Sequence, residues 1–123
     1  MQLLAIGVGG ALGAIARYAL GGAVHRLVPG SFPYGTFVVN VIGCLVFGIV
    51  IGLGESRFVL GPPTRAFLLV GVLGGFTTFS SFTFETFELL RSDQFGAASA
   101  NVVGQIALGL LALWAGLGVG RAL

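Results

Sequence analysis

The stretch GVLGGFTTFSSFTFE, from Gly71 to Glu85, lies inside a long hydrophobic segment, yet it carries a glycine pair, five hydroxyl residues and four phenylalanines. Adjacent glycines weaken a helix because they lose the most backbone entropy on becoming ordered. At membrane depth, a broken helix is tolerated only where it is buried in protein or lines a polar cavity. Broken membrane helices tend to mark ion or substrate sites. We therefore expect this segment to be the functional centre of the chain.

The composition around this stretch is typical of a membrane protein. Of the 123 residues, 56% are hydrophobic and 8% are charged, whereas a soluble domain carries about a quarter charged residues. Four hydrophobic spans are each near the ~20 residues needed to cross a bilayer. They cover residues of about 3–27, 34–54, 64–89 and 96–119. The sequence predicts a single domain, residues 1–123, that is an all-α integral membrane protein with four transmembrane helices, the third broken near its middle. The sequence has no run of basic residues that would indicate a nucleic-acid partner.

The distribution of loop arginines bears on orientation. Arg57, Arg65 and Arg121 lie on the side that holds both termini, and Arg26 and Arg91 lie on the other. Loop arginines normally accumulate on the cytoplasmic side, and a split of three to two barely biases insertion. Either the chain inserts both ways or other signals decide. Insertion both ways would allow an antiparallel, dual-topology homodimer. Four helices enclose little more than their own side chains, so a solute path also favours more than one subunit.

Glycine spacing predicts close contacts between helices. Several pairs fit the small-xxx-small pattern that lets backbones approach each other in lipid: Gly9 and Gly13, Gly48 and Gly52, Gly71 and Gly75, and Gly116 and Gly120. Because the chain holds 22 glycines, such pairs also arise by chance. Packing, and not a binding site, is the simpler interpretation.

Polar side chains gather at one depth of the predicted bundle. Counted along the helices at ~1.5 Å per residue, Arg17, Asn40, Glu85, Asn101 and Gln105 all fall in the same half of the bilayer. In an antiparallel pair, each subunit would line one half of a path. Simpler interpretations stay open, since Arg17 could pair with loop carbonyls or attract anions at a vestibule. Asn101 and Gln105 share a helix face, as bonding between helices also requires.

The third helix offers chemistry suited to a small anion. Phe79 and Phe82 are three residues apart and lie on one face, and the edge of an aromatic ring carries a partial positive charge. Ser81 and Thr83 offer hydroxyl donors, and Asn40 offers an amide donor. Donors together with ring edges indicate an anion path, and packing of aromatic side chains is the alternative.

The chain resembles the Fluc (CrcB) family of small fluoride channels over nearly its whole length. Three motifs carry the resemblance: Gly9-Gly10 through Arg17-Tyr18; Tyr34-Gly35-Thr36 with Val39-Asn40 and Gly43; and Gly71-x-x-Gly74-Gly75-Phe76-Thr77-Thr78-Phe79-Ser80-Ser81-Phe82. The third is the most specific of the three at its spacing. The resemblance implies a fluoride channel of the cell membrane that exports cytoplasmic fluoride passively and so lowers its toxicity.

The resemblance also implies an assembly and a cofactor. It suggests an antiparallel homodimer with two fluoride pores and a structural Na⁺ at its centre. By motif position, the backbone carbonyls of Gly74 and Thr77 in each subunit would hold this ion.

Pore residues follow from the same resemblance. Phe79 and Phe82 are similar to the family's pore phenylalanines, and Asn40 to its pore asparagine. Asn101 and Gln105 lie where members of the family carry a polar track on the fourth helix.

Two other classes of protein compete with this interpretation. A small four-helix, dual-topology exporter of drugs or guanidinium would need a carboxylate deep in a helix, usually the first, and that span holds Arg17 but no acid. A non-transporting membrane scaffold would leave the polar residues of 74–82 unexplained. We do not expect an enzyme, because His25 and Cys44 lie in unconnected spans and no nucleophile–base pair is visible.

Overall fold

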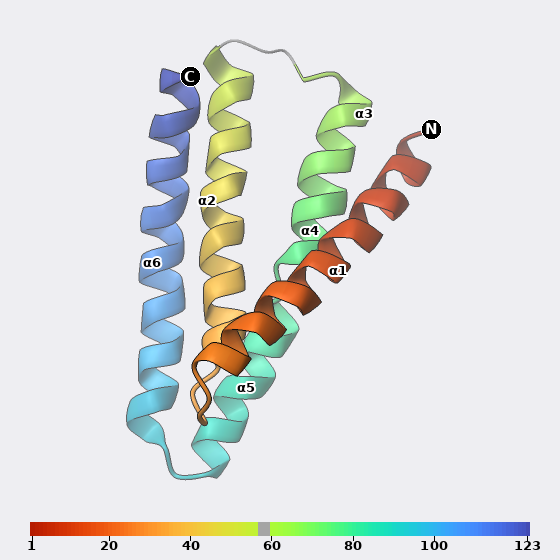
Figure 1. Ribbon diagram of the computed structural model, residues 1–123. Helices are drawn as coiled ribbons and strands as arrows, with labels where there is room; N and C mark the ends of the chain where they lie inside the picture. Colours follow the sequence, from red (N-terminus) through yellow and green to blue (C-terminus); the bar gives the residue numbers. More distant parts are fainter. Residues whose placement is uncertain (57–59) are drawn as a thin grey trace.

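The computed structural model describes residues 1–56 and 60–123. Within these residues four helical stretches are long and apolar enough to cross a membrane: Gln2–Leu27, Tyr34–Ser56, Pro62–Arg91 and Phe95–Ala122. This confirms the four predicted transmembrane helices. The two termini lie at the same end of the bundle (Figure 1). Arg57, one of the residues in the arginine count, lies outside the described residues.

Three of the four spans are continuous helices. These are α1 (Gln2–Leu27), α2 (Tyr34–Ser56) and α6 (Phe95–Ala122). Residues that favour turns separate them from their neighbours. Pro33 directly precedes α2, and Asp93, with a φ of 57°, adopts the left-handed conformation in the turn before α6.

The third span is interrupted, as predicted. It consists of α3 (Pro62–Arg65), the π-helical segment η1 (Ala66–Leu73), the short α4 (Gly74–Phe76) and α5 (Phe79–Arg91). Thr77 and Thr78 are extended between α4 and α5, with ψ angles of 158° and 113°. The break thus follows the glycine pair and does not fall on it, because Gly74 and Gly75 remain helical.

Glycines bring α2 and α6 into close contact along their length (Figure 1). A Cβ added at Gly52 would lie 2.6 Å from the Leu117 carbonyl oxygen, and one at Gly116 would overlap the Leu45 carbonyl oxygen. The paired residues Gly48 and Gly120 face backbone in the same way. The predicted glycine contacts are therefore confirmed for this helix pair.

A second glycine contact joins α1 to the first half of the broken span. Helix α1 crosses this half obliquely (Figure 1). A Cβ at Gly9 would lie 2.6 Å from the Phe67 carbonyl oxygen, and one at Gly71 would lie 2.9 Å from that of Ile6. These backbone approaches fix the side of α1 that packs against η1.

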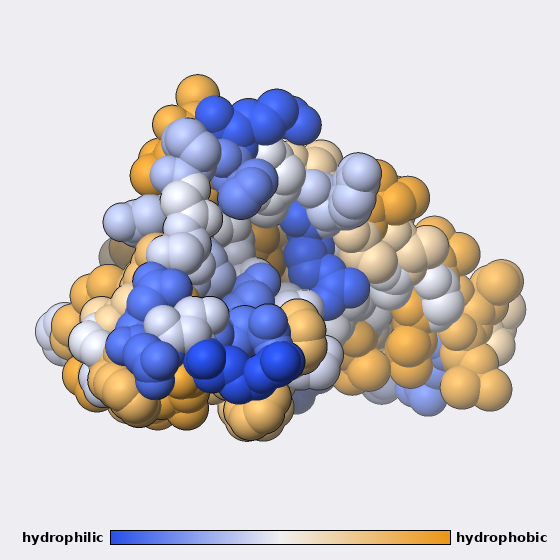
Figure 2. Space-filling view, turned by 90° about the horizontal axis from the view of Figure 1, so that it is seen from below, coloured by the Kyte–Doolittle hydropathy of each residue, from blue (hydrophilic) through white to orange (hydrophobic). Residues whose placement is uncertain are grey.

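Polar side chains make up an unusually large share of the buried side chains in one chain. Thr78, Asn101 and Gln105 are all buried, and Asn101 has no exposed surface at all. Large apolar side chains instead face outward on several helices, as lipid contact or contact with another subunit allows. Seen from the end opposite the termini, hydrophilic residues gather around a hollow while apolar residues cover the flanks (Figure 2).

Candidate functional site

The helix break is bridged by one side chain from α2. The backbone N–H of Thr78 donates to Oδ1 of Asn40 at 2.8 Å, and Nδ2 of Asn40 donates to the Thr78 carbonyl oxygen at 3.1 Å. The Asn40 amide thus satisfies both backbone groups of an extended residue that lies deep in a membrane-spanning segment. Such satisfaction is what a break at this depth requires.

The break changes the partners of two backbone carbonyls. In a continuous helix, the N–H groups of Thr78 and Ser81 would bond to the carbonyls of Gly74 and Thr77. Here Thr78 N–H donates to Asn40, and Ser81 N–H donates to Oγ1 of Thr78 at 3.2 Å as the N-terminal cap of α5. The carbonyls of Gly74 and Thr77 therefore lose the amide partners that a helix would give them.

A chain of side-chain hydrogen bonds runs from the break along α6. Nδ2 of Asn40 donates to Oε1 of Gln105 at 2.8 Å, and Nε2 of Gln105 donates to Oδ1 of Asn101 at 2.9 Å. Nδ2 of Asn101 donates to Oγ1 of Thr86 at 2.9 Å, and the Thr86 hydroxyl donates to the Phe82 carbonyl oxygen at 2.7 Å. We call Asn40, Gln105, Asn101 and Thr86 the amide network.

Phenylalanine rings border a groove beside this network. The groove has a volume of about 440 Å³, and its lining includes Asn40, Gln105, Phe79 and Phe82. The two rings are tilted by 45° with their centroids 5.6 Å apart. Phe79 is 78% exposed in the single chain, so within one subunit its ring is open to an ion or to a second subunit.

The two hydroxyl residues predicted for the ion path differ in availability. The Ser81 hydroxyl accepts a hydrogen bond from the Thr78 hydroxyl at 3.0 Å, which leaves its own hydrogen to donate. The Thr83 hydroxyl donates to the Phe79 carbonyl oxygen of its own helix at 3.0 Å. Ser81 is therefore the better donor of the two.

Arg17 does not line the groove that Phe79 and Phe82 border. It lines a cavity of about 330 Å³ together with Thr36, Thr78 and Ser81. Among the described residues, no ion pair is found for its guanidinium. Thr78 borders both this cavity and the groove, so the break separates a cationic cavity from an aromatic one.

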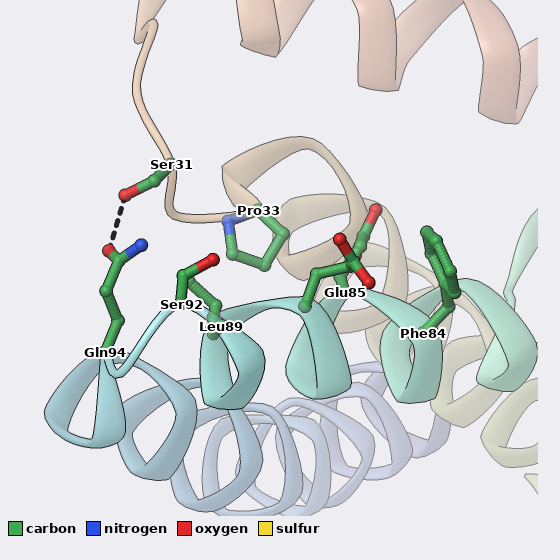
Figure 3. Close-up of a pocket in the computed structure, with 8 residues that line it drawn as sticks. Ser31, Pro33, Phe84, Glu85, Leu89, Ser92 and Gln94 are labelled. Atoms are coloured by element: carbon green, nitrogen blue, oxygen red, sulfur yellow. Dashed lines mark hydrogen bonds between the residues drawn. The ribbon is translucent and has the colours of Figure 1, made fainter.

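Glu85 lies in a third cavity, about 210 Å³ in volume, near the loop that joins α1 to α2 (Figure 3). Its Oε1 accepts a hydrogen bond from the Thr36 hydroxyl at 2.7 Å, and its Oε2 is buried without a hydrogen-bond partner among the described residues. At the other end of this cavity, the Ser31 hydroxyl donates to Oε1 of Gln94 at 2.7 Å.

Comparison with known proteins identifies the family of this chain. A sequence profile of the family described as "CrcB-like protein, Camphor Resistance (CrcB)" matches residues 4–117. The chain belongs to the CrcB family. A relative named "Fluoride-specific ion channel FluC" from Nitratidesulfovibrio vulgaris (strain DSM 19637 / Miyazaki F) is 52% identical over 120 residues, which are 98% of this chain and 97% of the relative.

Further relatives of the same name come from other bacteria. The protein from Maridesulfovibrio salexigens is 45% identical over 98% of this chain and 95% of its own length, and that from Geobacter sulfurreducens is 45% identical over 98% of both chains. The family resemblance predicted from the motifs is confirmed, and this CrcB-family chain is a multi-pass membrane protein.

The structure brings together most of the residues predicted for the site of this CrcB-family chain. Asn40, Gln105 and Asn101 are hydrogen-bonded in one network, and Phe79 and Phe82 border the same groove. Arg17 and Ser81 share a separate cavity across the break, and Glu85 bonds to α2 nearer the loop.

Three threonines in the site were not predicted from the sequence. Thr78 is an extended residue of the break and caps the N-terminus of α5. Thr86 is the last residue of the amide network, and the Thr36 hydroxyl donates to Glu85. Thr36 and Thr78 belong to the family motifs, which could have drawn attention to them. Thr86 follows Phe82 by one helical turn, and nothing in its neighbourhood in the sequence marks it.

Proposed function

We propose that this chain is a fluoride channel of the plasma membrane that exports cytoplasmic fluoride passively. One observation carries the proposal: relatives that match 98% of the chain bear the name fluoride-specific ion channel. The proposed activity is ion conduction and not an enzymatic reaction. Hydrogen fluoride that enters a cell from an acidic medium ionises at near-neutral internal pH, and the membrane potential then drives the trapped anion out.

The chemistry of the site supports an anion as the conducted ion. Fluoride is small and strongly hydrated, so a path must replace water with hydrogen-bond donors. Ser81 keeps a free hydroxyl hydrogen, and Arg17 supplies a positive charge in the same cavity. On the other side of the break, the ring edges of Phe79 and Phe82 can contact an anion without holding it tightly.

The assembly we propose is an antiparallel homodimer with two pores. A single chain leaves the ring of Phe79 and the backbone of Gly74 exposed at mid-membrane, and a second subunit would cover both. The nearly balanced arginines on the two sides favour insertion in both orientations.

A structural Na⁺ at the centre of this dimer fits the donor set. The carbonyls of Gly74 and Thr77 lack the amide partners of a continuous helix, because Thr78 N–H and Ser81 N–H donate elsewhere. Carbonyl oxygens suit a hard cation. Two such carbonyls from each of two subunits would hold the ion and join the subunits at the break.

Fluoride efflux from liposomes that contain the purified protein tests this function. With a potassium ionophore to balance charge, internal fluoride should leave down its gradient, and a protonophore that collapses any proton gradient should leave the rate unchanged. A drug or guanidinium exporter would need such a gradient and a buried acid, and α1 holds none. Absence of fluoride efflux, or its arrest by the protonophore, would contradict the proposal.

A further inference from the structure

The segment η1 is a π-helix of eight residues that leads into the helix break. A π-helix is closed by hydrogen bonds between residues five apart, so each of its turns holds more residues than an α-helical turn does. π-helices are rare, and most are single turns inside an α-helix. A rare conformation of this length needs contacts that hold it in place.

Helix α1 supplies these contacts, because η1 packs mainly against it. A Cβ at Gly9 would lie 2.6 Å from the Phe67 carbonyl oxygen and 3.0 Å from the Val72 nitrogen, which are five residues apart as the partners of a π-helical bond are. A Cβ at Gly13 would overlap the Val72 carbonyl oxygen. The step along α1 is thus four residues, whereas the matching step along η1 is five. Over this distance η1 stores one residue more than an α-helix would need.

The sequence beyond η1 is compatible with a second register. If η1 became α-helical while Phe67 stayed against Gly9, the residues after η1 would advance by one place, because a four-residue step would replace the five-residue step. Three pairs of identical neighbours follow η1: Gly74-Gly75, Thr77-Thr78 and Ser80-Ser81. In the advanced register, the first member of each pair would take the place of the second.

The second member of each pair makes contacts that its neighbour could make again. A Cβ at Gly75 would lie 2.5 Å from the Gly10 carbonyl oxygen, so this place requires a glycine. The peptide group of Thr78 pairs with Asn40, and the Thr78 hydroxyl caps α5. Ser81 lines the cavity of about 330 Å³ beside α1. The residue types required at these three places are therefore present in both registers.

The advance has to end within the first turns of α5. Further along this helix it would put Glu88 in the place of Leu89, which is only 3% exposed, and a carboxylate buried there would be costly. The extra residue is therefore taken up directly after Ser81, as a new π-helical turn. The rest of α5 keeps its position.

We propose that η1 and the residues up to Ser81 form a register switch with two states. In the described state, η1 stores the extra residue and the ring of Phe79 borders the groove. In the advanced state, Thr78 takes the place of Phe79, and the Thr77 carbonyl pairs with Asn40. The switch therefore exchanges an aromatic ring for a hydroxyl in the groove, and it withdraws one of the carbonyls that we propose for Na⁺.

NMR relaxation dispersion of the intact protein tests whether both states exist, because helix register shifts fall in the μs–ms range that it detects. A sample labelled with ¹⁵N-threonine gives six backbone signals, from the threonines at 36, 64, 77, 78, 83 and 86. Thr77 and Thr78 should show dispersion. Thr64 and Thr86 should not, because they lie before η1 and after the new π-helical turn.

Deletion of Val70 removes the stored residue. Val70 is 59% exposed and lines neither the groove nor the cavity beside α1. An α-helical η1 then fits the present contacts with α1, so the thermal stability should be retained and the dispersion at Thr77 and Thr78 should be lost. Fluoride efflux should equal or exceed the wild-type rate, because every molecule presents Phe79 to the groove.

Deletion of Leu111 is the matched control. This residue is 58% exposed, but it lies in the α-helix α6, which stores no extra residue. Its deletion rotates Gly116 away from the Leu45 carbonyl oxygen that it now meets. The variant should therefore lose the thermal stability that the Val70 deletion retains.

Each outcome decides one part of the proposal. A wild-type protein without dispersion at Thr77 and Thr78, or dispersion that persists after deletion of Val70, would overturn the switch. Equal thermal stability of the two deletion variants would overturn the stored residue. Slower efflux from a folded Val70 deletion variant would overturn the assignment of the described state to conduction. Absence of fluoride efflux from the wild-type protein would contradict the proposed function alone, since dispersion and stability do not depend on it.

Discussion

Phe79 and Phe82 have different environments although they are neighbours on one face of α5. Phe79 is largely exposed in the single chain, whereas Phe82 is partly covered. Their spacing predicted a shared face, and the structure confirms that both rings line one groove beside Asn40 and Gln105. Their contact with a passing anion stays a prediction, because packing alone could place two rings at this distance.

The first prediction concerns these rings. Phe79→Ile and Phe82→Ile keep apolar bulk but delete the ring edge. Since the edge contact of one aromatic ring is worth about 1 kcal/mol, loss of both rings should lower fluoride efflux by roughly thirty-fold while the proposed dimer stays intact. Phe87→Ile makes the same change at an exposed position of the same helix and should leave efflux unaltered. A dimeric double variant with wild-type efflux would reduce the rings to packing residues.

The second prediction separates the carbonyls at the break from the side chains that carry them. Thr77→Ala keeps the carbonyl and removes a hydroxyl that bonds to the Leu73 carbonyl oxygen, so Na⁺ binding should largely survive. A Cβ at Gly74 would meet only the Leu69 carbonyl oxygen, at 3.8 Å, within its own chain. Gly74→Val should therefore act on the partner subunit and on Na⁺ binding, and not on the fold of one chain.

Size-exclusion chromatography with light scattering and ²³Na NMR of the purified protein check this contrast. The prediction is that Gly74→Val loses dimer and Na⁺ binding together, while Thr77→Ala retains both. A Gly74→Val dimer that still binds Na⁺ would place the ion elsewhere.

At the scale of helices, the sequence predicted that the third span is broken near its middle, which the structure confirms, but it did not predict the residues at which the break falls. The glycine pair at Gly74 suggested the place, because glycine destabilises helices. The break falls instead at Thr77 and Thr78, where Asn40 from another helix takes over the Thr78 N–H and carbonyl. A contact between residues so far apart in the sequence depends on how the helices pack. This packing cannot be predicted from the local sequence around the glycine pair.

Glycine contacts between helices are the element-scale feature that the sequence predicted best, because the small-xxx-small spacing is itself the packing rule. The four pairs all face neighbouring backbone in the structure. The π-helical segment η1, by contrast, has no signal in its apolar sequence AFLLVGVL, and the amide network needs residues from three separate spans.

The third prediction tests the contact between α2 and α6. A Cβ at Gly116 would overlap the Leu45 carbonyl oxygen, whereas one at Gly118 would meet nothing within 4 Å in the same chain. Gly116→Ala should destabilise the protein by about 1–3 kcal/mol, as overpacking does, and Gly118→Ala should not. Thermal unfolding of both variants in the same detergent checks this, and equal stability of the two would contradict the proposed packing.

At the scale of the whole molecule, four membrane-spanning helices explain the apolar composition of the chain but not its buried polar residues. The four spans are apolar enough for lipid, and the exposed ring of Phe79 is open either to lipid or to the second subunit that we propose. At the end opposite the termini, hydrophilic residues gather around a hollow (Figure 2). An antiparallel partner would supply a polar half on the other side of the bilayer.

The fourth prediction concerns this topology. Two or three lysines added to one loop should fix the orientation of insertion, because positive charge in short loops is retained in the cytoplasm. A single locked form should then lose fluoride conduction, and co-expression of two oppositely locked forms should restore it. Protection of cells from added fluoride is the measurement, and full protection by one locked form alone would rule out an obligate antiparallel dimer.

The central claim is that this CrcB-family chain is a passive conductor of fluoride. Electrical recording from the purified protein in a planar bilayer, with different fluoride concentrations on the two sides and equal chloride, tests it most directly. The account predicts a current that reverses at the equilibrium potential of fluoride and does not shift when a pH gradient is imposed. A bilayer without current, a reversal potential that follows the proton gradient, or one at zero, the equilibrium potential of the equal chloride, would contradict it.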